Sequence, residues 1–262
     1  MRPSHRDAPG ASARGRAAVN IGVSAAAFLA VWEISVWAFA LPAYMLPGPA
    51  RVGAALWTRG DYLLSHAGIT ALETLAGLVL GCLTGVLIAV AMSLSPLVRR
   101  FALPAIVITQ ALPVFAIAPL LVLWFGFGIA SKIVMAMLII FFPVASSFYD
   151  GLTRTDPDLL DYARLTRATR WQVMLYFRIP AALPALSTGL RVSAVFAPIG
   201  AIVGEWVGSS AGLGFVMLQA NARVQTDLVF AALAILAVMA LLLRFAVARI
   251  TTAMVPWQAE TD

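Results

Sequence analysis

Six stretches of the sequence are apolar over about 20 residues or more, the length that an α-helix needs to cross the hydrocarbon core of a membrane. These stretches lie near residues 19–41, 67–94, 101–125, 129–149, 183–207 and 228–248. Inside a bilayer the backbone has no water to bond with, so each stretch is expected to form a helix that satisfies its own hydrogen bonds. The sequence therefore predicts an all-α, polytopic membrane protein with six transmembrane helices.

The composition agrees with a membrane location and excludes several other classes of protein. Hydrophobic residues make up 61% of the chain and charged residues 11%, whereas about a quarter of the residues in a soluble domain are charged. The single cysteine, Cys82, excludes an intrachain disulfide, and with only two histidines the chain has no cysteine- or histidine-rich metal site. We therefore expect no bound metal ion. The net charge of +6 is spread over loops between apolar runs, so we do not expect a nucleic-acid partner either.

The distribution of lysine and arginine indicates the orientation of the chain, because cytoplasmic loops carry an excess of these residues. The first apolar run is too long for the hydrophobic core of a signal peptide and contains Glu33, so we expect it to remain as a helix. With the N-terminus inside, the cytoplasmic segments hold Arg2, Arg6, Arg14, Arg16, Arg99, Arg100, Arg154, Arg164, Arg167, Arg170, Arg178, Arg244 and Arg249. The outer segments hold only Arg51, Arg59, Lys132 and Arg223. Both termini are therefore predicted to be cytoplasmic, with the chain in the cell inner membrane.

We expect one transmembrane domain flanked by two short tails. Residues 1–16 are rich in Arg, Ala, Pro and Ser and are predicted to form a disordered basic tail. The transmembrane domain then covers residues 17–252, and residues 253–262 form a cytoplasmic C-terminal tail.

Proline and glycine mark places where the predicted helices bend or pack closely. Pro113 lies in the middle of the third apolar run, with Pro104 and Pro119 on either side, and Pro143 lies in the fourth. Such prolines bend a membrane helix, either as packing features or as part of a gate. The second run holds three glycines at intervals of four, a pattern that lets two helices approach closely. These glycines are Gly77, Gly81 and Gly85.

Four ionisable residues lie in or at the ends of the predicted helices, where burying a charge is costly. They are Glu33, Glu73, Arg191 and Glu205. Such residues are functional candidates by default. However, pairing with a neighbour, or solvation where a helix end meets water, explains them as well.

The longest segment on the cytoplasmic side, residues 151–182, has the pattern of two short amphipathic helices joined by a turn. Residues 155–158, Thr-Asp-Pro-Asp, supply a helix cap, a first-turn proline and an acid at the positive end of the helix dipole. Apolar residues recur on both sides of the polar stretch 166–170, and Pro180 and Pro184 are expected to end the second helix. A helix on the membrane surface and a protein docking site fit this pattern equally well.

Within this segment Asp161-Tyr162-Ala163 is followed by Arg167, and then by Phe177, Ile179 and Pro180. This spacing resembles the signature EAA-x3-G-x9-I-x-L-P of binding-protein-dependent ABC importer permeases. Further motifs resemble the branch of this family that imports nitrate, sulfonates, taurine and pyrimidines. They are Leu46-Pro47-Gly48-Pro49, Ala118-Pro119-Leu120, Trp124-Phe125-Gly126, Ala181-Ala182-Leu183-Pro184, Thr188-Gly189-Leu190-Arg191, and Glu205 followed by Gly212-Leu213-Gly214. The motifs occur in the expected order from about residue 46 to the C-terminus.

The resemblance implies a permease domain whose loop, residues 151–182, forms coupling helices that fit a groove on a separate ATPase subunit. The residues implied for this contact are Asp161, Tyr162, Ala163, Arg164, Arg167, Phe177, Ile179 and Pro180. Asp161 stands at the glutamate of the signature, Tyr162 at its first alanine and Arg167 at its glycine. Glycine adopts conformations that other residues resist, so Arg167 is expected to reshape the turn or change the contact with the ATPase.

The chain lacks the means to hydrolyse ATP through a P-loop. That motif needs Gly-x4-Gly-Lys-Ser/Thr, and the only lysine, Lys132, stands in the sequence Ala-Ser-Lys-Ile. We therefore expect a non-catalytic subunit without a cofactor of its own, and ATP and Mg²⁺ on the partner ATPase. The resemblance also implies a homodimer and a soluble substrate-binding protein on the outer side.

The predicted substrate rests on residues 204–214 and 219–223, which resemble permeases for the hydroxymethylpyrimidine precursor of thiamine. Uptake of this thiamine precursor is therefore the predicted transport, and sulfonate, taurine and nitrate are the alternatives. The pathway is expected where helices bend and polar groups face inward. Its candidate residues are Thr109, Gln110, Pro113, Phe115, Ser193, Phe196 and Glu205.

A proton- or ion-coupled secondary transporter is the alternative from a different class. It would use Glu33, Glu73 and Glu205 as relay groups and would transport without an ATPase. Paired inverted repeats with broken helices would favour it, and we see none in the sequence. For a membrane scaffold without transport activity, the sequence offers no specific support.

Overall fold

The computed structural model describes residues 11–111 and 113–257, and these ranges contain helices and connecting turns but no strand. The helices are α1 (Ala11–Ala38), α2 (Pro49–Thr58), α3 (Gly60–Leu94), α4 (Pro96–Ala111), α5 (Val114–Phe125), α6 (Ile129–Thr153), α7 (Pro157–Leu165), α8 (Arg170–Val173), the π-helical turn η1 (Met174–Arg178), α9 (Ile179–Gly208), α10 (Leu213–Ala222) and α11 (Thr226–Met254). Four helices in the described part of the chain are long and apolar enough to cross a membrane. They are α3, α6, the continuous helix Arg170–Gly208, and α11. The predicted all-α membrane fold is thus confirmed, with these four at the second, fourth, fifth and sixth apolar runs.

The chain divides into two units, which are described separately. The smaller unit, Met1–Gly60 with Ala220–Ala231, contains α1 and α2. Inside this unit the Trp32 ring lies 5.5 Å from the Phe230 ring, and the Thr226 hydroxyl donates a hydrogen bond to the carbonyl of Tyr44 at 2.7 Å.

Helices extend into both segments that the sequence predicted as tails. Helix α1 begins at Ala11, so the last part of the tail predicted over residues 1–16 is helical, and residues 1–10 lie outside the described residues. At the other end α11 continues to Met254, into the predicted C-terminal tail, and residues 258–262 lie outside the described residues.

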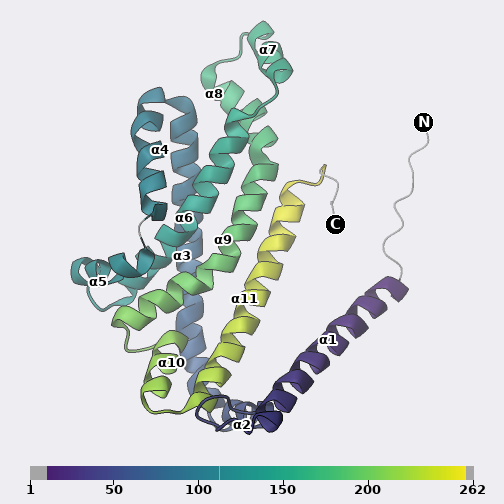
Figure 1. Ribbon diagram of the computed structural model, residues 1–262. Helices are drawn as coiled ribbons and strands as arrows, with labels where there is room; N and C mark the ends of the chain where they lie inside the picture. Colours follow the sequence, from purple (N-terminus) through teal and green to yellow (C-terminus); the bar gives the residue numbers. More distant parts are fainter. Residues whose placement is uncertain (1–10, 112, 258–262) are drawn as a thin grey trace. The chain divides into compact units, whose positions relative to one another are not determined.

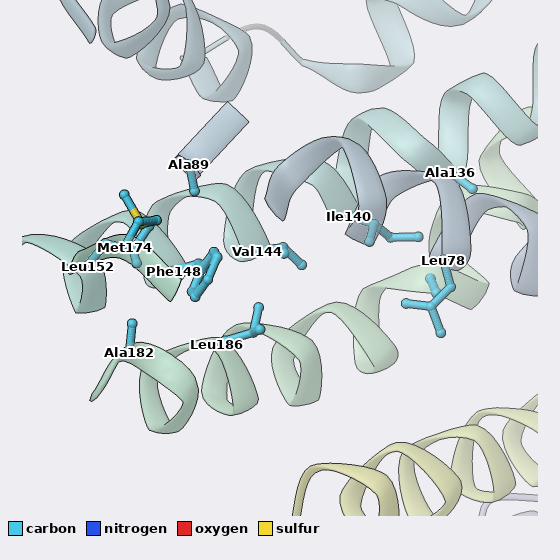
Figure 2. Close-up of a cluster of buried hydrophobic side chains, with 11 residues drawn as sticks. Leu78, Ala89, Ala136, Ile140, Val144, Phe148, Leu152, Met174, Ala182 and Leu186 are labelled. Carbon is cyan, nitrogen blue, oxygen red and sulfur yellow. The ribbon is translucent and has the colours of Figure 1, made fainter. Parts of the chain in front are cut away.

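In the larger unit, Asp61–Gln219 with Ala232–Asp262, helices α3, α6 and α9 pack around one apolar core (Figure 1). Figure 2 shows this cluster, in which Phe148 and Ile140 of α6 lie between residues of α3 and α9. Its buried members are Leu78, Ala89, Ala136, Ile140, Val144, Phe148, Leu152, Met174, Ala182, Leu186 and Ala197. One member, Met174, belongs to η1, so the loop before α9 is anchored in the same core.

The three glycines of α3 bring it into close contact with α6, as the sequence predicted. A Cβ atom added at Gly81 would lie 2.8 Å from Cβ of Ile140, and one added at Gly85 would lie 2.9 Å from Cβ of Val144. Four residues further along α3, the contact on α6 is also four residues further along. Helices α3 and α6 therefore run parallel. Only the absence of side chains on α3 allows an approach this close.

Helix α9 packs against α6 in the opposite direction. A Cβ atom added at Gly204 would lie 3.0 Å from Cα of Lys132, whereas one at Gly189 would lie 2.8 Å from the carbonyl oxygen of Pro143. The charged Arg191 of α9 is exposed. Its Nε donates to the hydroxyl of Thr251 at 2.8 Å, which joins α9 to α11.

The third apolar run forms two helices, where the sequence predicted one bent helix. Helix α4 ends at Ala111 and α5 begins at Val114, with Pro113 in an extended conformation at the start of α5. Proline lacks an N–H group and forces the preceding residue away from the helical conformation, so a break at this point is physically expected. Pro104, Pro119 and Pro143 remain inside their helices.

The prediction that Pro180 and Pro184 end the second loop helix is wrong. Helix α8, the π turn η1 and α9 form one continuous helix, Arg170–Gly208, with Pro180 in the first turn of α9 and Pro184 inside it. In the π turn the N–H of Ile179 donates to the carbonyl of Met174, five residues earlier. This wider turn directly precedes the proline, which has no N–H to give to the usual carbonyl four residues back.

The contact between α3 and α6 predicts opposite effects for two glycine substitutions in α3. Gly81→Ala places a methyl group against Ile140, so we expect it to destabilise the protein by about 1–3 kcal/mol. Gly68→Ala is the matched control, because a Cβ atom there meets nothing within 4 Å and alanine favours a helix. Thermal unfolding of the purified protein in detergent measures both. Equal melting temperatures for the two variants would contradict the close contact.

Candidate functional site

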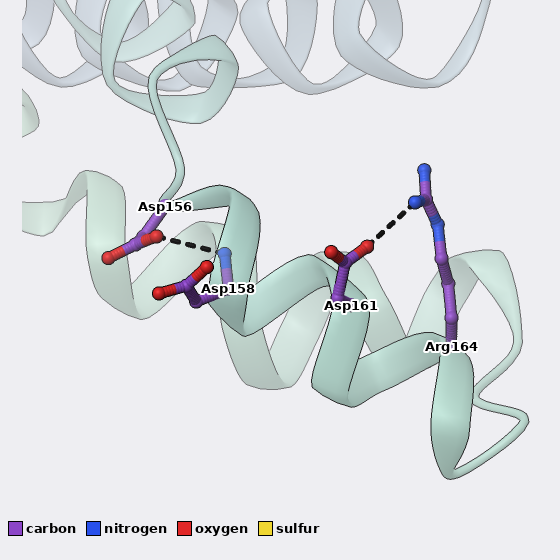
Figure 3. Close-up of polar contacts among 4 residues, drawn as sticks. All are labelled: Asp156, Asp158, Asp161 and Arg164. Atoms are coloured by element: carbon purple, nitrogen blue, oxygen red, sulfur yellow. Dashed lines mark hydrogen bonds and ion pairs between the residues drawn. The ribbon is translucent and has the colours of Figure 1, made fainter.

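Helix α7 begins with the cap that the sequence predicted. The Asp156 carboxylate accepts a hydrogen bond from the N–H of Asp158 at 2.9 Å, and Pro157 occupies the first turn. One turn further on, Arg164 forms an ion pair with Asp161 at 2.7 Å (Figure 3). Both side chains of this pair are exposed, so it contributes little to stability and leaves the charges available to a partner.

The turn after α7 keeps the conformation that glycine would adopt, although Arg167 stands there. Arg167 has a φ of +53°, in the left-handed region that non-glycine residues resist. Its N–H donates to the carbonyl of Arg164 at 3.0 Å, and the N–H of Ala168 donates to the carbonyl of Ala163 at 3.0 Å. These two bonds form a Schellman motif, which ends a helix with a left-handed residue. The turn at Arg167 is therefore left-handed and carries backbone strain, and a changed contact with the ATPase stays a prediction.

The second loop helix starts with a capping box. The Thr169 hydroxyl accepts from the N–H of Gln172 at 3.3 Å, and the Gln172 side chain accepts from the N–H of Thr169 at 2.8 Å. This reciprocal pair satisfies two backbone N–H groups that a helix start leaves free. Both helices of the loop are thus fixed by local interactions, and η1 connects the second one to α9 without a break.

The loop presents exposed apolar and aromatic side chains, which we call the loop surface. It consists of Leu159, Tyr162, Leu165, Trp171, Leu175 and Tyr176. Leu165 is 83% exposed and Trp171 is 62% exposed, and the basic residues Arg164, Arg167 and Arg170 are exposed among them. Aromatic residues and arginine are enriched where proteins bind one another, so the surface has the chemistry of a docking site.

The predicted coupling residues divide between this surface and the core. Asp161, Tyr162, Arg164 and Arg167 are exposed, whereas Ala163 is fully buried. The other three, Phe177, Ile179 and Pro180, are half-buried, and the Phe177 ring lies 6.3 Å from the Tyr162 ring across the turn.

At the opposite end of α9 lies a buried polar cluster, which we call the carboxylate site. Glu205 and Glu73 are each 1% exposed, so neither has the solvation at a helix end that the sequence allowed for. The Glu205 carboxylate accepts from the Thr70 hydroxyl at 2.6 Å, from the N–H of Gly214, and from the N–H of Phe215 at 3.4 Å. The N–H of Leu213 donates to Thr70 at 2.8 Å. The first three N–H groups of α10 are therefore all satisfied by side chains from α3 and α9.

The Gly-Leu-Gly motif of the sequence has a physical role in this site. Gly212 has a φ of +106°, and a Cβ atom there would collide with the Glu205 carboxylate. Its N–H donates to Nδ1 of His66 at 2.9 Å. The motif thus needs glycine because the backbone must turn tightly against a buried acid.

Sequence reasoning named Glu73 as a candidate but missed Lys132, which lies in the same site. Lys132 is buried, and its ammonium group donates to the carbonyls of Phe127 and Gly128 at 2.9 Å each. Glu73 interacts electrostatically with both Glu205 and Lys132, and its Oε2 atom has no hydrogen-bond partner. The sequence did indicate such a site, because a lysine and two glutamates in apolar runs need partners. The spacing of the runs did not show which of these side chains lie next to one another.

The predicted pathway residues lie in different environments. The side chains of Thr109, Pro113, Phe115 and Phe196 are exposed. By contrast, Ser193 is fully buried, donates to the carbonyl of Ile140 at 3.2 Å and joins α9 to α6, and Glu205 lies in the carboxylate site. The side chain of Gln110 lies outside the described part of the chain.

Comparison with known proteins shows which family has this sequence and fold. The profile of the family described as "Binding-protein-dependent transport system inner membrane component" matches residues 77–259. The chain belongs to this family. A probable ABC transporter permease protein of Haemophilus influenzae is 49% identical over 84% of this chain and 89% of that protein. The formylaminopyrimidine transport permease ThiX of Halalkalibacterium halodurans is 33% identical over 88% of this chain and 92% of that protein.

The fold agrees with the family. A solved structure of the MetNI methionine ABC transporter in inward-facing conformations matches with a TM-score of 0.64 and 20% identity, over 74% of this chain and 96% of that one. The resemblance seen in the sequence is thus confirmed. The protein is an ABC permease, a non-catalytic membrane subunit whose ATPase is a separate partner.

The strain at Arg167 predicts that Arg167→Gly stabilises the turn. Glycine removes the left-handed penalty and adds some freedom to the unfolded chain, so we expect a net gain of about 0.5–1 kcal/mol. Arg164→Gly is the matched control, because it removes the same charge from a helical position and costs about 1 kcal/mol. Hydrogen exchange over residues 157–178 should slow for the first variant and accelerate for the second. Faster exchange in both would contradict a left-handed Arg167.

The hydrogen bonds of Glu205 predict a difference between two buried glutamates. Glu205→Leu removes both carboxylate oxygens, so the N–H groups of Gly214 and Phe215 lose their acceptor and we expect exchange at residues 209–215 to accelerate about tenfold or more. Glu73→Leu is the control, because Glu73 is equally buried and the N–H groups of α10 bond to Thr70 and Glu205 instead. It should leave exchange unchanged or slower. If both variants accelerate exchange equally, Glu205 does not hold this loop.

Proposed function

We propose that the protein is the membrane-spanning subunit of a homodimeric ABC importer in the cell inner membrane. Each chain crosses the membrane six times, with both termini in the cytoplasm. A substrate-binding protein delivers the solute on the outer side, and the partner ATPase, which binds ATP and Mg²⁺, docks on the cytoplasmic loop. The observation that carries this proposal is the continuous helix Arg170–Gly208, which begins in the loop surface and ends at the carboxylate site.

The parallel packing of α3 and α6 supports the count of six crossings. Because both helices run in the same direction, the chain between Leu94 and Ile129 has to return across the membrane. Helices α4 and α5 have 16 and 12 residues, together about 42 Å of helix, and they make this crossing as a broken pair. In helix α1 the apolar part is Gly22–Ala38, whose 17 residues are near the lower limit for a membrane span.

The loop surface is the docking site for the ATPase in this proposal. Its two helices are fixed by their own caps, so the surface is formed before a partner arrives and little ordering is needed on binding. Met174 anchors the second helix in the core of α3, α6 and α9. A shift of the docked ATPase therefore moves α9 as a body, because no flexible link separates Arg170 from Gly208.

In this proposal the shift of α9 reaches the outer side at the end of the helix that carries Glu205. Glu205 holds the first turn of α10 and the preceding loop, residues 209–212, so a tilt of α9 displaces them. Of the predicted pathway residues, the exposed Thr109, Pro113, Phe115 and Phe196 are free to line a path between two copies, and we include Gln110 with them. Ser193 and Glu205 then support the path from inside the helix packing.

We infer that the solute is a pyrimidine precursor of thiamine, such as hydroxymethylpyrimidine. The relative ThiX, named for formylaminopyrimidine transport, supports this inference, as do residues 204–214. The branch that the sequence resembles also imports sulfonates, taurine and nitrate, and these are the competing solutes. A neutral or weakly polar solute agrees with the pathway set, whose members carry no charge apart from the buried Glu205.

The docking role predicts that Trp171→Asp separates the permease from its ATPase. A buried tryptophan in an interface commonly contributes at least about 2 kcal/mol, so we expect affinity for the ATPase to fall about thirtyfold or more. Trp257→Asp is the matched control, because Trp257 is also 62% exposed and lies outside the loop surface. Co-purification of the ATPase with each variant measures the difference. Loss of the ATPase from Trp257→Asp but not from Trp171→Asp would place docking elsewhere.

The same proteins test transport and substrate together. In vesicles that contain the permease, the ATPase and the binding protein, we expect ATP-dependent uptake of hydroxymethylpyrimidine, abolished by Trp171→Asp. Uptake of taurine or nitrate instead would keep the importer and replace the substrate. Uptake that persists without any ATPase would overturn the importer itself.

A further inference from the structure

A pocket of about 350 Å³ lies in the larger unit, between the end of α3, the start of α4 and the helix formed by α8 and η1. One wall is apolar and consists of Leu94, Val173 and Met174. The polar wall carries two guanidinium groups, those of Arg170 and Arg178, and the hydroxyl of Ser93. The pocket is therefore amphiphilic, and its lining residues include no acid.

The two arginines of the pocket are not neutralised within the described part of the chain. The ion pair described above joins Arg164 to Asp161 and involves neither of them. Arg178 donates from Nη1 to the Ser93 hydroxyl at 3.1 Å, and its Nε atom is buried without an acceptor. A buried donor without an acceptor is unfavourable, so the pocket has a place for an anion that accepts hydrogen bonds.

The pocket lies at the level where membrane helices end. Ser93 and Leu94 are the last residues of α3, and Arg170 begins the continuous helix Arg170–Gly208, so the ends of two long helices meet at the pocket. Pro96, which also lines the pocket, begins α4, and the start of a helix carries partial positive charge. Lipid headgroups occupy this level of a bilayer, and basic pockets between membrane helices bind anionic headgroups.

We propose that this pocket binds the headgroup of an anionic membrane phospholipid. The phosphate accepts hydrogen bonds from Arg170 and Arg178, and the glycerol lies against the apolar wall. A carboxylate of the docked ATPase is the competing occupant, and the apolar wall at the helix ends favours lipid. Because Arg170 begins α8, a bound lipid would fix the helix on which the ATPase docks, and this goes beyond the transport function proposed above.

Native mass spectrometry of the full-length protein in detergent tests the proposal. The probes are phosphatidylglycerol and the zwitterionic phosphatidylcholine, and we expect one phosphatidylglycerol per chain to be retained in preference. The double variant Arg170→Gln/Arg178→Gln should retain it about thirtyfold more weakly. The matched control Arg154→Gln/Arg249→Gln removes the same charge outside the pocket and should retain the lipid like the native chain.

Each alternative source of the anion has its own outcome. Equal retention of both lipids by the native chain, or equal loss in both double variants, would overturn the proposal. So would displacement of phosphatidylglycerol by inorganic phosphate, which would indicate a site for a free anion. Measured on the complex with the ATPase, retained lipid supports the proposal, and displaced lipid would assign the pocket to the ATPase. Lipid selectivity of the native chain is independent of how any variant folds.

Discussion

Helix α6 is in close contact with glycine-bearing helices on two sides, and the rest of the larger unit depends on these contacts. Gly81 of α3 lies against Ile140, and Gly200 of α9 lies against Ala136, where an added Cβ atom would be 2.7 Å from its Cα. In a membrane, lipid tails are as apolar as the side chains, so van der Waals contact and small residues stabilise helix pairs. The same packing fixes α3 as parallel and α9 as antiparallel to α6.

The continuous helix Arg170–Gly208 gives this packed core a mechanical role. It joins the loop surface at one end to the carboxylate site at the other, and Pro180 does not interrupt it because a π turn precedes the proline. A break there would have separated the proposed docking site from the membrane helices. The strained turn at Arg167 and the two capping motifs keep the loop in one shape, so in the proposed function the ATPase docks on the same rigid element that moves.

Buried polar groups occur at both ends of the core, and they differ in how they are satisfied. Glu205 accepts three hydrogen bonds and holds the start of α10, whereas the Nε atom of Arg178 has no partner and lies at an amphiphilic pocket. The sequence identified Glu205 and the Gly-Leu-Gly motif after it, but not Thr70 or Lys132. These partners are far apart in the chain, and helix periodicity does not specify which faces of two membrane helices meet.

The sequence by itself determined the class of the protein, the positions of four long membrane helices, the glycine face of α3 and the cap of α7. These features depend on hydropathy and on interactions within a few residues, which are local properties of the chain. The break before Pro113, the continuity through Pro180 and the left-handed Arg167 are local backbone conformations that the sequence permits and the structure selects. Tertiary structure decided the burial of Glu73 and the pairing of Glu205 with Thr70. Both depend on which groups from distant parts of the chain are available to fill space or to form a hydrogen bond. Spacing along one sequence does not contain that information, because close packing in the membrane is set by pairs of helix faces.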